Sequence, residues 1–253
     1  MDNRKTEILS GIHPVIEALK ANRRKFFKIF IKKNLKRSRP EINAFFKHID
    51  HMNCEFEYVD TRLLDELTNN AKHQGIAARV SAFPVMNNND FFARVEKSEK
   101  PPFVLILENI EDPHNFGALI RTALCAGADY IMIPKDRSVA PVPSVSRSSA
   151  GAMEYAEICL ITNTASTIRK LKDKGAWIAG LDASGETSLF DTDFSGFFAL
   201  VVGGEHKGIR PLVKKECDFL ISIPMQGKIN SLNASVAGGI VLYEAFRKRN
   251  LLN

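Results

Sequence analysis

The chain has 253 residues and a mass of 28.2 kDa, which suits two small domains or one large domain. Hydrophobic residues make up 45% and charged residues 25%, a balance that excludes a disordered tail protein, collagen and a small disulfide scaffold. The formal net charge is +6, and residues 1–100 carry all of it, with 19 Lys and Arg against 13 Asp and Glu. This asymmetry favours an anionic partner for the first part of the chain.

The sequence also argues against a membrane protein, a secreted protein and a zinc-binding protein. Apolar runs such as Phe103–Leu107 are far shorter than the ~18 residues of a membrane span. The N-terminal residues form no apolar signal segment, so we expect a cytoplasmic protein. The cysteines form no CxxC pair, which predicts no metal site and buried free thiols in a reducing cytosol; they are Cys54, Cys125, Cys159 and Cys217.

Residues 1–83 predict a compact α/β domain. Periodicity predicts helices over 13–22, 39–52 and 61–67, the last of them capped, and strands over 26–33, 55–59 and 75–83. Residues 84–100 are rich in Pro, Asn and charge and predict a linker, with a short helix around 91–95.

Residues 101–253 predict a doubly wound α/β domain. Apolar strands are expected at 103–107, 130–134, 157–161, 177–181, 197–202 and 219–223, with helices between most of them. Such alternation is typical of a parallel sheet covered on both faces. The final helix, 232–248, begins with small residues that allow another backbone to approach closely. Neither G-x-G-x-x-G nor a P-loop is present, which disfavours a Rossmann-type cofactor or a nucleoside triphosphate.

Two polar segments follow predicted strands, where open α/β sheets place their chemistry. In residues 108–123, Asn115 is a candidate N-cap and Arg121 lies early on a mainly apolar helix. The alternative for Arg121 is a solvated side chain with a buried stem. In the second segment, Gly203 and Gly204 allow close approach of a ligand or another chain segment, and Glu205 follows them. The alternative for this second segment is an ordinary tight turn with an exposed Glu.

A third segment, residues 221–235, gathers polar side chains at the start of the final helix. Asn230, Ser231, Asn233 and Ser235 lie where free backbone N–H groups occur. Capping by Ser231 explains part of this cluster, but one cap does not need four polar residues.

Together the three segments resemble the motifs of the SpoU (TrmH) family of the SPOUT superfamily, the RNA 2′-O-ribose methyltransferases. Motif one resembles Asp112–Arg121, motif two Gly203–Gly208 and motif three Ile223–Ser235. Residues 11–15 and 64–79 resemble the N-terminal domain of the RlmB-type members, which modify a guanosine of large-subunit ribosomal RNA. The chain departs from the family where Gly204, His206 and Ala234 stand in place of the frequent Asn, Gly and Val.

The resemblance implies a SPOUT-type parallel-sheet domain over 101–253 with a C-terminal trefoil knot, preceded by a small ribosomal-protein-like α/β RNA-binding domain over 1–83. It implies S-adenosylmethionine (SAM) as methyl donor, a homodimer through the final helix, and neither a metal nor DNA as partner. The implied catalytic residues are Asn115, Arg121, Glu205, Ser231 and Asn233. The implied cofactor-binding residues are Gly203, Gly204, Ile223, Met225 and Leu232.

The basic run over 20–39, with ten Lys and Arg and no acidic residue, is then expected to hold RNA. The candidates are Lys25, Lys28, Lys32, Lys33, Lys36 and Arg37, and Arg147 is a further candidate close to the active site. Two alternatives remain: a tRNA 2′-O-methyltransferase, and a non-catalytic RNA-binding or assembly protein on the same scaffold.

Overall fold

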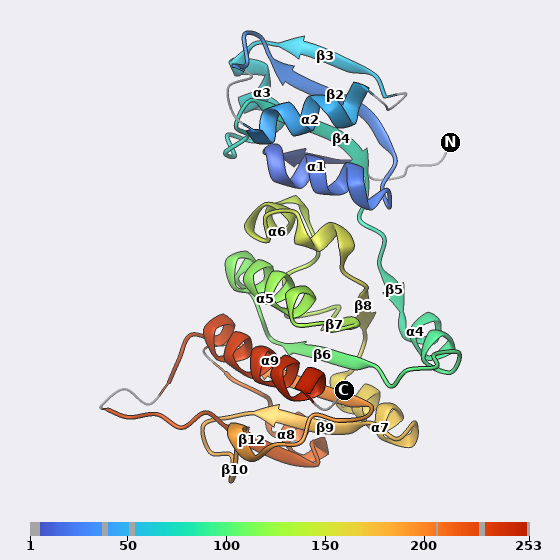
Figure 1. The fold of residues 1–253 in the computed structure, drawn as a ribbon, viewed down its shortest axis with the longest axis vertical. Helices are drawn as coiled ribbons and strands as arrows, with labels where there is room; N and C mark the ends of the chain where they lie inside the picture. The colour runs from blue at the N-terminus through green and yellow to red at the C-terminus, as the bar shows by residue number, and fades with distance from the viewer. Residues whose placement is uncertain (1–5, 37–39, 51–53, 206, 228–230, 252–253) are drawn as a thin grey trace. The chain divides into compact units, whose positions relative to one another are not determined.

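The fold is described from a computed structural model, which describes residues 6–36, 40–50, 54–205, 207–227 and 231–251. The chain divides into two compact units (Figure 1). The first unit comprises Met1–Pro84 together with Pro141–Tyr155, and the second comprises Val85–Ala140 together with Ala156–Asn253.

The first unit is a four-stranded sheet with helices on both faces. Its strand order is β1-β4-β2-β3, in which β4 is antiparallel to β1 and β2, and β3 is parallel to β2. Alternate strand residues pack against α1 and α2 on one face and against α3 on the other. The bounds are β1 (Thr6–Ser10), α1 (Ile12–Ala21), β2 (Phe26–Lys32), α2 (Pro40–Asp50), β3 (Phe56–Val59), α3 (Thr61–Leu67) and β4 (Ile76–Ser81), with α6 (Pro143–Ser148) and the 3₁₀ helix η1 (Ala152–Tyr155) from the later segment.

The described part of the second unit contains an eight-stranded sheet whose strands are all parallel. Its order is β10-β12-β9-β11-β6-β7-β8-β5. The bounds are β5 (Met86–Asn87), α4 (Asn88–Val95), β6 (Phe103–Glu108), α5 (Pro113–Cys125), β7 (Tyr130–Pro134), β8 (Ile158–Ile161), α7 (Thr164–Asp173), β9 (Trp177–Leu181), β10 (Thr187–Ser188), η2 (Leu189–Asp191), β11 (Phe198–Gly203), α8 (Pro211–Glu216), β12 (Phe219–Ser222) and α9 (Ala234–Leu251).

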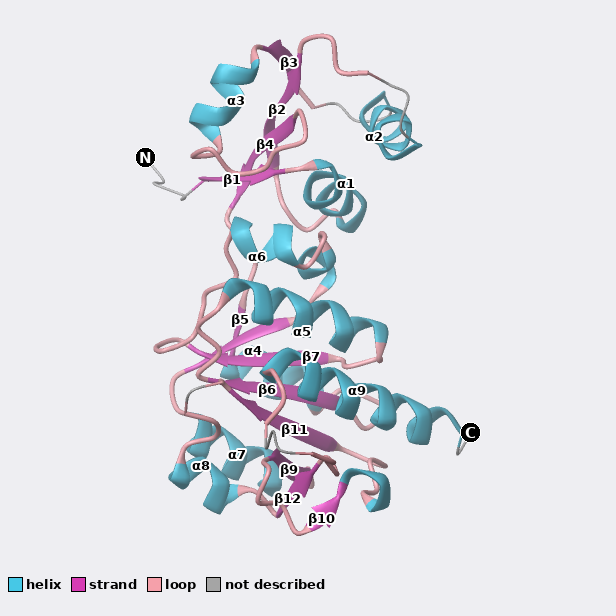
Figure 2. Cartoon of the chain, turned by 90° about the vertical axis from the view of Figure 1, so that its left-hand side faces the viewer, coloured by secondary structure: helices cyan, strands magenta, loops and turns pink. Residues whose placement is uncertain are grey.

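Helices cover both faces of this sheet. Apolar residues of α4, α7 and α8 pack on one face, and α5 and α9 lie side by side on the other (Figure 2). The predicted parallel α/β domain is therefore confirmed, while the trefoil knot stays a prediction. No helix in the described ranges has both the length and the apolar character needed to cross a bilayer.

The small residues of α9 allow the close approach that the sequence predicts, and the neighbour is the chain itself. A Cβ at Gly238 would lie 2.5 Å from Leu119 of α5 and 3.6 Å from Val202 of β11. The exposed apolar side chains of α9 are others: Val236, Ile240, Tyr243 and Phe246.

The short helix predicted around 91–95 is present within α4, but residues 84–100 otherwise differ from the predicted linker. Met86 and Asn87 form β5, which pairs with β8, and Asn87 caps α4 by accepting from the backbone N–H groups of Asn89 and Asp90. Phe91 is fully buried in the core of the second unit, so apolar burial outweighs the polar composition of this stretch.

Two local predictions also fail. The side chain of Asp60, at the start of α3, makes no capping bond and pairs instead with Lys33. Of the thiols predicted to be buried, Cys159 is buried and Cys54 and Cys217 are half-buried. Cys125 is exposed because it ends α5, where the helix reaches the surface.

Candidate active site

The three polar segments meet at the carboxyl edge of the large sheet. β6, β11 and β12 all end there, and the segments that follow them carry Asn115, Glu205 and Asn233, of which Asn115 lies in the first turn of α5. Asn115 Nδ2 donates to Glu205 Oε1 at 3.0 Å, and Asn233 Nδ2 donates to Asn115 Oδ1 at 3.1 Å. Asn233 Nδ2 also donates to Glu205 Oε1. One carboxylate therefore orients two amides that lie 118 positions apart in the chain.

Asn233 is held from both of its ends. Its Oδ1 accepts from the backbone N–H groups of Ser235 and Val236 at 2.9 and 3.2 Å, so Asn233 is the N-cap of α9. The alternative of capping by Ser231 is therefore wrong. With Oδ1 occupied by the cap, Nδ2 is the end that faces Glu205.

The predicted N-cap of α5 is also corrected. Asp112 caps this helix by accepting from the backbone N–H groups of His114 and Asn115 at 3.2 and 3.1 Å, and Pro113 occupies the first helical position. A carboxylate just before Pro is the better cap, and Asn115 is the third residue of the helix, within its first turn. Its amide is thereby free to bind Glu205.

A pocket beside this cluster collects all the predicted cofactor-binding residues. Gly203, Gly204, Ile223, Met225 and Leu232 line it, together with Glu205 and Ser231. The sequence reasoning missed Leu181–Ala183, which also line the pocket. These residues lie at the carboxyl end of β9, which is between β12 and β11 in the parallel sheet. The rule that sites lie at the carboxyl ends of such strands could have found them.

The paired glycines are required by close backbone packing. A Cβ at Gly203 would lie 2.2 Å from the carbonyl carbon of Gly208, and a Cβ at Gly204 would lie 2.1 Å from the carbonyl oxygen of Asn109. Gly208 N also donates to Gly204 O at 2.8 Å. Backbone from the segments that follow β6 and β11 is thus brought together beside the pocket.

Asp182 places a charged group in the pocket wall. Burial acts to raise its pKa, but hydrogen bonds from Lys214 and Ser184 outweigh burial and hold the pKa below its ordinary value of 3.8. The Lys214 Nζ lies 2.5 Å from Asp182 Oδ2. The carboxylate is therefore ionised at neutral pH.

A second pocket adjoins the first and shares Gly204, Glu205 and Ala234 with it. Asn109, Asn115 and Lys207 also line this second pocket. Asn109 Nδ2 is buried and has no hydrogen-bond partner among the described residues, so it is a donor that a bound molecule can use. Glu205 thus lies at the boundary of two pockets, which can hold two different molecules.

The structure does not bring Arg121 into the Asn115–Glu205–Asn233 cluster. Arg121 is exposed on α5, six residues beyond Asn115, which is about 9 Å along the helix axis. Among the residues that the structure describes it forms no ion pair. The groups that Glu205 positions are the amide donors of Asn115 and Asn233, not Arg121.

The predicted RNA-binding residues fall into distinct groups. Lys36 is exposed, and Lys25 is exposed with its Nζ 5.3 Å from the centre of the Phe27 ring. Lys28 is bound by acidic side chains of the β3 strand and the residue before it, and hydrogen bonds to these carboxylates raise its pKa. Lys33 pairs with an Asp, and Lys32 is half-buried.

The remaining basic candidates lie elsewhere. Arg37 is outside the described residues. Arg147 belongs to α6 in the first unit, and its Nη1 donates to Ser10 Oγ at 2.7 Å. Arg24, part of the basic run, is only 5% exposed and is removed from any RNA-binding surface. No group of three or more His, Cys, Asp or Glu in the described ranges is arranged to hold a metal ion.

Comparison with known proteins places the chain among RNA-modifying enzymes. Residues 102–243 match the model of the SpoU rRNA methylase family, and residues 8–86 match the model for RNA 2′-O ribose methyltransferase substrate binding. A Bacillus subtilis protein described as a TrmH family tRNA/rRNA methyltransferase, YacO, is 39% identical over 240 residues, covering 95% of both chains.

Two solved structures share the fold over nearly the whole chain. The SpoU methyltransferase AviRb from Streptomyces viridochromogenes, solved with AdoMet (SAM), is 22% identical with a TM-score of 0.78, covering 96% of this chain and 90% of its own. An AdoMet-bound rRNA methyltransferase from Sinorhizobium meliloti is 23% identical with a TM-score of 0.76, covering 98% of this chain and 88% of its own.

Proposed function

The chain belongs to the SpoU (TrmH) family of RNA methyltransferases, and we propose that it transfers the methyl group of SAM to a ribose 2′-hydroxyl of RNA, on a guanosine of large-subunit ribosomal RNA. The observation that carries this proposal is the meeting of Asn115, Glu205 and Asn233 at the boundary of two pockets. A methyl transfer between two bound molecules needs such a boundary, because donor and acceptor must meet in line.

The first pocket fits the chemistry of SAM. Its wall combines apolar side chains, including Leu181, Ile223 and Leu232, with backbone from the paired glycines, a surface suited to a flat purine. Because neighbouring backbone fills the space beside Gly203 and Gly204, no side chain fits there, and the wall at this point is made of backbone. SAM supplies a methyl group on a positively charged sulfur, which makes that methyl an electrophile.

The second pocket is proposed to receive the target nucleotide. Its amides, at Asn109 and Asn115, can bind ribose and base oxygens, and Lys207 can bind a phosphate. Asn115 and Asn233 are proposed to orient the reacting hydroxyl, while Glu205 holds both amides in place. The carboxylate thereby fixes the direction in which the hydroxyl oxygen points.

Arg121 is proposed to act as a cation that holds an RNA phosphate. A ribose hydroxyl is a weak nucleophile, so its proton must leave and its developing charge must be stabilised. The pKa of an Arg guanidinium lies far above 7, so a neutral Arg acting as the base at neutral pH is energetically costly. A phosphate oxygen of the RNA or a water molecule is therefore the proposed proton acceptor, and the position of Arg121 outside the cluster supports this role.

The variant Arg121→Ala tests this assignment. Methyl transfer should be abolished, because the RNA backbone loses its anchor, while SAM affinity measured by calorimetry stays unchanged. Lys170, exposed on α7, offers a control, since Lys170→Ala removes a cation away from both pockets. Retained turnover in Arg121→Ala would contradict the assignment.

The ribosomal target is supported by the family model, which is that of an rRNA methylase, and by the match over 8–86 to a substrate-binding domain. Mapping ribose methylation in cellular RNA with and without this protein tests the target. Loss of a single ribosomal guanosine mark is expected. A missing tRNA mark would favour the tRNA alternative, and a protein that binds RNA without SAM or product would be an assembly factor.

We further propose that the protein acts as a homodimer through α9. Val236, Ile240, Tyr243 and Phe246 of this helix are 38–52% exposed, and Phe190 beside them is 58% exposed. Exposed apolar side chains gathered in this way mark protein interfaces. Tyr243→Glu should convert a dimer to a monomer in sedimentation velocity, and a wild-type monomer at micromolar concentration would refute this proposal.

A further inference from the structure

Residues 141–155 connect two strands of the methyltransferase sheet but belong to the other compact unit. The chain leaves the eight-stranded sheet after β7, passes through α6 and η1, and returns to the sheet at β8. Within the first unit, α6 packs against β1 and η1 packs against α1. The first unit is therefore joined to the second by three chain connections, at 84–85, 140–141 and 155–156.

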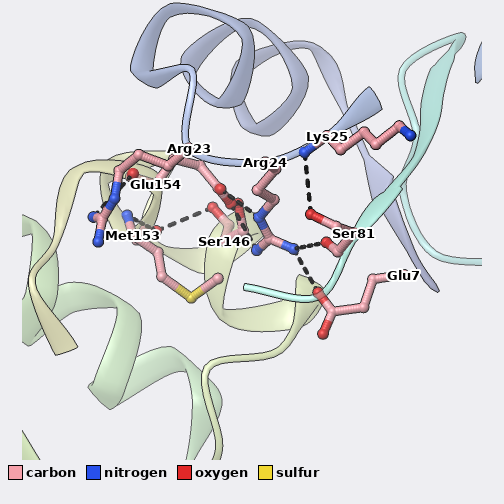
Figure 3. A network of polar contacts seen from close by, with 9 residues as sticks. Glu7, Arg23, Arg24, Lys25, Ser81, Ser146, Met153 and Glu154 are labelled. Carbon is pink, nitrogen blue, oxygen red and sulfur yellow. Dashed lines mark hydrogen bonds and ion pairs between the residues drawn. The ribbon is translucent and has the colours of Figure 1, made fainter. Parts of the chain in front are cut away.

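A buried ion pair holds this segment in the first unit (Figure 3). Arg24 Nε and Nη2 donate to the two carboxylate oxygens of Glu154 at 2.7 and 3.1 Å. Ser146 Oγ donates to the same carboxylate at 2.7 Å. Glu154 is 0% exposed and Arg24 is 5% exposed, so both charges are removed from water and matched by each other.

The third nitrogen of the Arg24 guanidinium is also hydrogen-bonded. Its Nη1 donates to Glu7 Oε2 at 2.5 Å and to the carbonyl oxygen of Ser81 at 3.2 Å, and the Phe83 ring centre lies 5.1 Å from its Cζ. One side chain thus joins β1, the end of β4 and η1. Only the planar, five-donor fork of Arg can satisfy these acceptors together.

A buried ion pair of this kind contributes little net stability, and its main effect is to favour one arrangement of the packed segments. The cost of removing two charges from water offsets much of their attraction, whereas removing one partner leaves an uncompensated buried charge. A fully satisfied polar network also has one geometry, while an apolar contact tolerates sliding. The docked position of 141–155 is the one in which all these polar groups are bonded.

We propose that Arg24 and Glu154 are positioning residues for methyl transfer, which limit the freedom of the RNA-binding unit through the docked segment. This inference rests on the proposed function. RNA held by the first unit must reach the Asn115–Glu205–Asn233 cluster in the second unit. With 141–155 undocked, the 84–85 connection alone would tether the first unit, and the effective concentration of bound RNA at the cluster would fall.

The test replaces both charges by apolar side chains of similar length, in the full chain. Arg24→Met combined with Glu154→Met removes the two fully buried charges together. Glu7 loses its Arg24 partner but keeps contact with water, so the thermal midpoint should stay near that of the wild type. Hydrogen exchange of the amides over 141–155 should become faster. The kcat for RNA methylation should fall about 10- to 100-fold, while the KM for RNA and the affinity for SAM stay unchanged.

Two further variants serve as controls. Arg62→Met with Glu66→Met makes the same replacement at an exposed ion pair on α3 and should leave kcat unchanged. Arg24→Lys keeps the charge but not the planar fork of donors, so its kcat should lie between those of the wild type and the double variant. A folded double variant with wild-type kcat, or with unchanged exchange over 141–155, would overturn the inference. A wild-type protein that methylates no RNA would refute the proposed function instead, and the exchange measurement would still test the docking.

Discussion

Replacing Asn233 by Asp separates its two roles, because the oxygen and the nitrogen of its amide bind different partners. Oδ1 caps α9 and Nδ2 binds Glu205 and Asn115. Asp and Asn are equally good N-caps, so Asn233→Asp should preserve the helix. The variant loses the donor and places a second carboxylate against Glu205.

The expected loss follows from these contacts. A hydrogen bond to a charged group contributes about 1.5 kcal/mol at the lower end of its range, which suits this exposed site. Two like charges about 4 Å apart in water repel by about 1 kcal/mol. Together these amount to about 2–3 kcal/mol, or roughly a 30- to 160-fold fall in kcat/KM for RNA methylation.

The assay is transfer of labelled methyl from SAM to transcribed ribosomal RNA, measured beside thermal denaturation. The matched control is Asn163→Asp, because Asn163 caps α7 by accepting from the Ser166 N–H at 2.9 Å and lies outside both pockets. Asn233→Ala should lower stability by about 1 kcal/mol as well as activity, since it also removes the cap. Wild-type turnover in Asn233→Asp, or an equal loss in Asn163→Asp, would refute the reasoning.

Two other predictions concern the cofactor pocket. Because a Cβ at Gly204 would lie 2.1 Å from a backbone carbonyl oxygen, Gly204→Ala should abolish SAM binding in calorimetry; unchanged affinity would show that the loops do not pack this closely. The second concerns Asp182, whose pKa in the folded protein is below its ordinary 3.8. When folding lowers the pKa of a carboxyl group, its ionised form stabilises the folded protein at pH values above the pKa in the unfolded chain. This contribution is lost as the pH falls through the pKa in the folded protein. Asp182→Asn should therefore lower the melting temperature at pH 7, and the gap to wild type should close below about pH 3.8. A gap that is the same at all pH values would contradict the role of the Lys214 pair.

Elements with strong periodicity were predictable, and short or half-exposed ones were not. The strand predicted at 130–134 agrees with β7, and the helix predicted at 13–22 agrees with α1 to within one residue at each end. By contrast, β5 and β10 contain two residues each, which is too short for a period to show. The segment around α6 is short and Ser-rich, so no apolar pattern marks it, and Arg24, which bonds it through Glu154, lies more than a hundred residues away.

The sequence by itself determined the alternation of strands and helices, the family motifs and the glycines that no other residue can replace. These depend on local backbone preference and on apolar periodicity, both of which are written in neighbouring residues. Tertiary structure alone decided which end of Asn233 faces Glu205, that Asp112 caps α5 in place of Asn115, and that Arg121 lies outside the cluster. It also decided that Arg24 is buried. Each of these depends on which distant acceptor comes within hydrogen-bonding distance of a donor, and only the packing of the sheet brings such groups together.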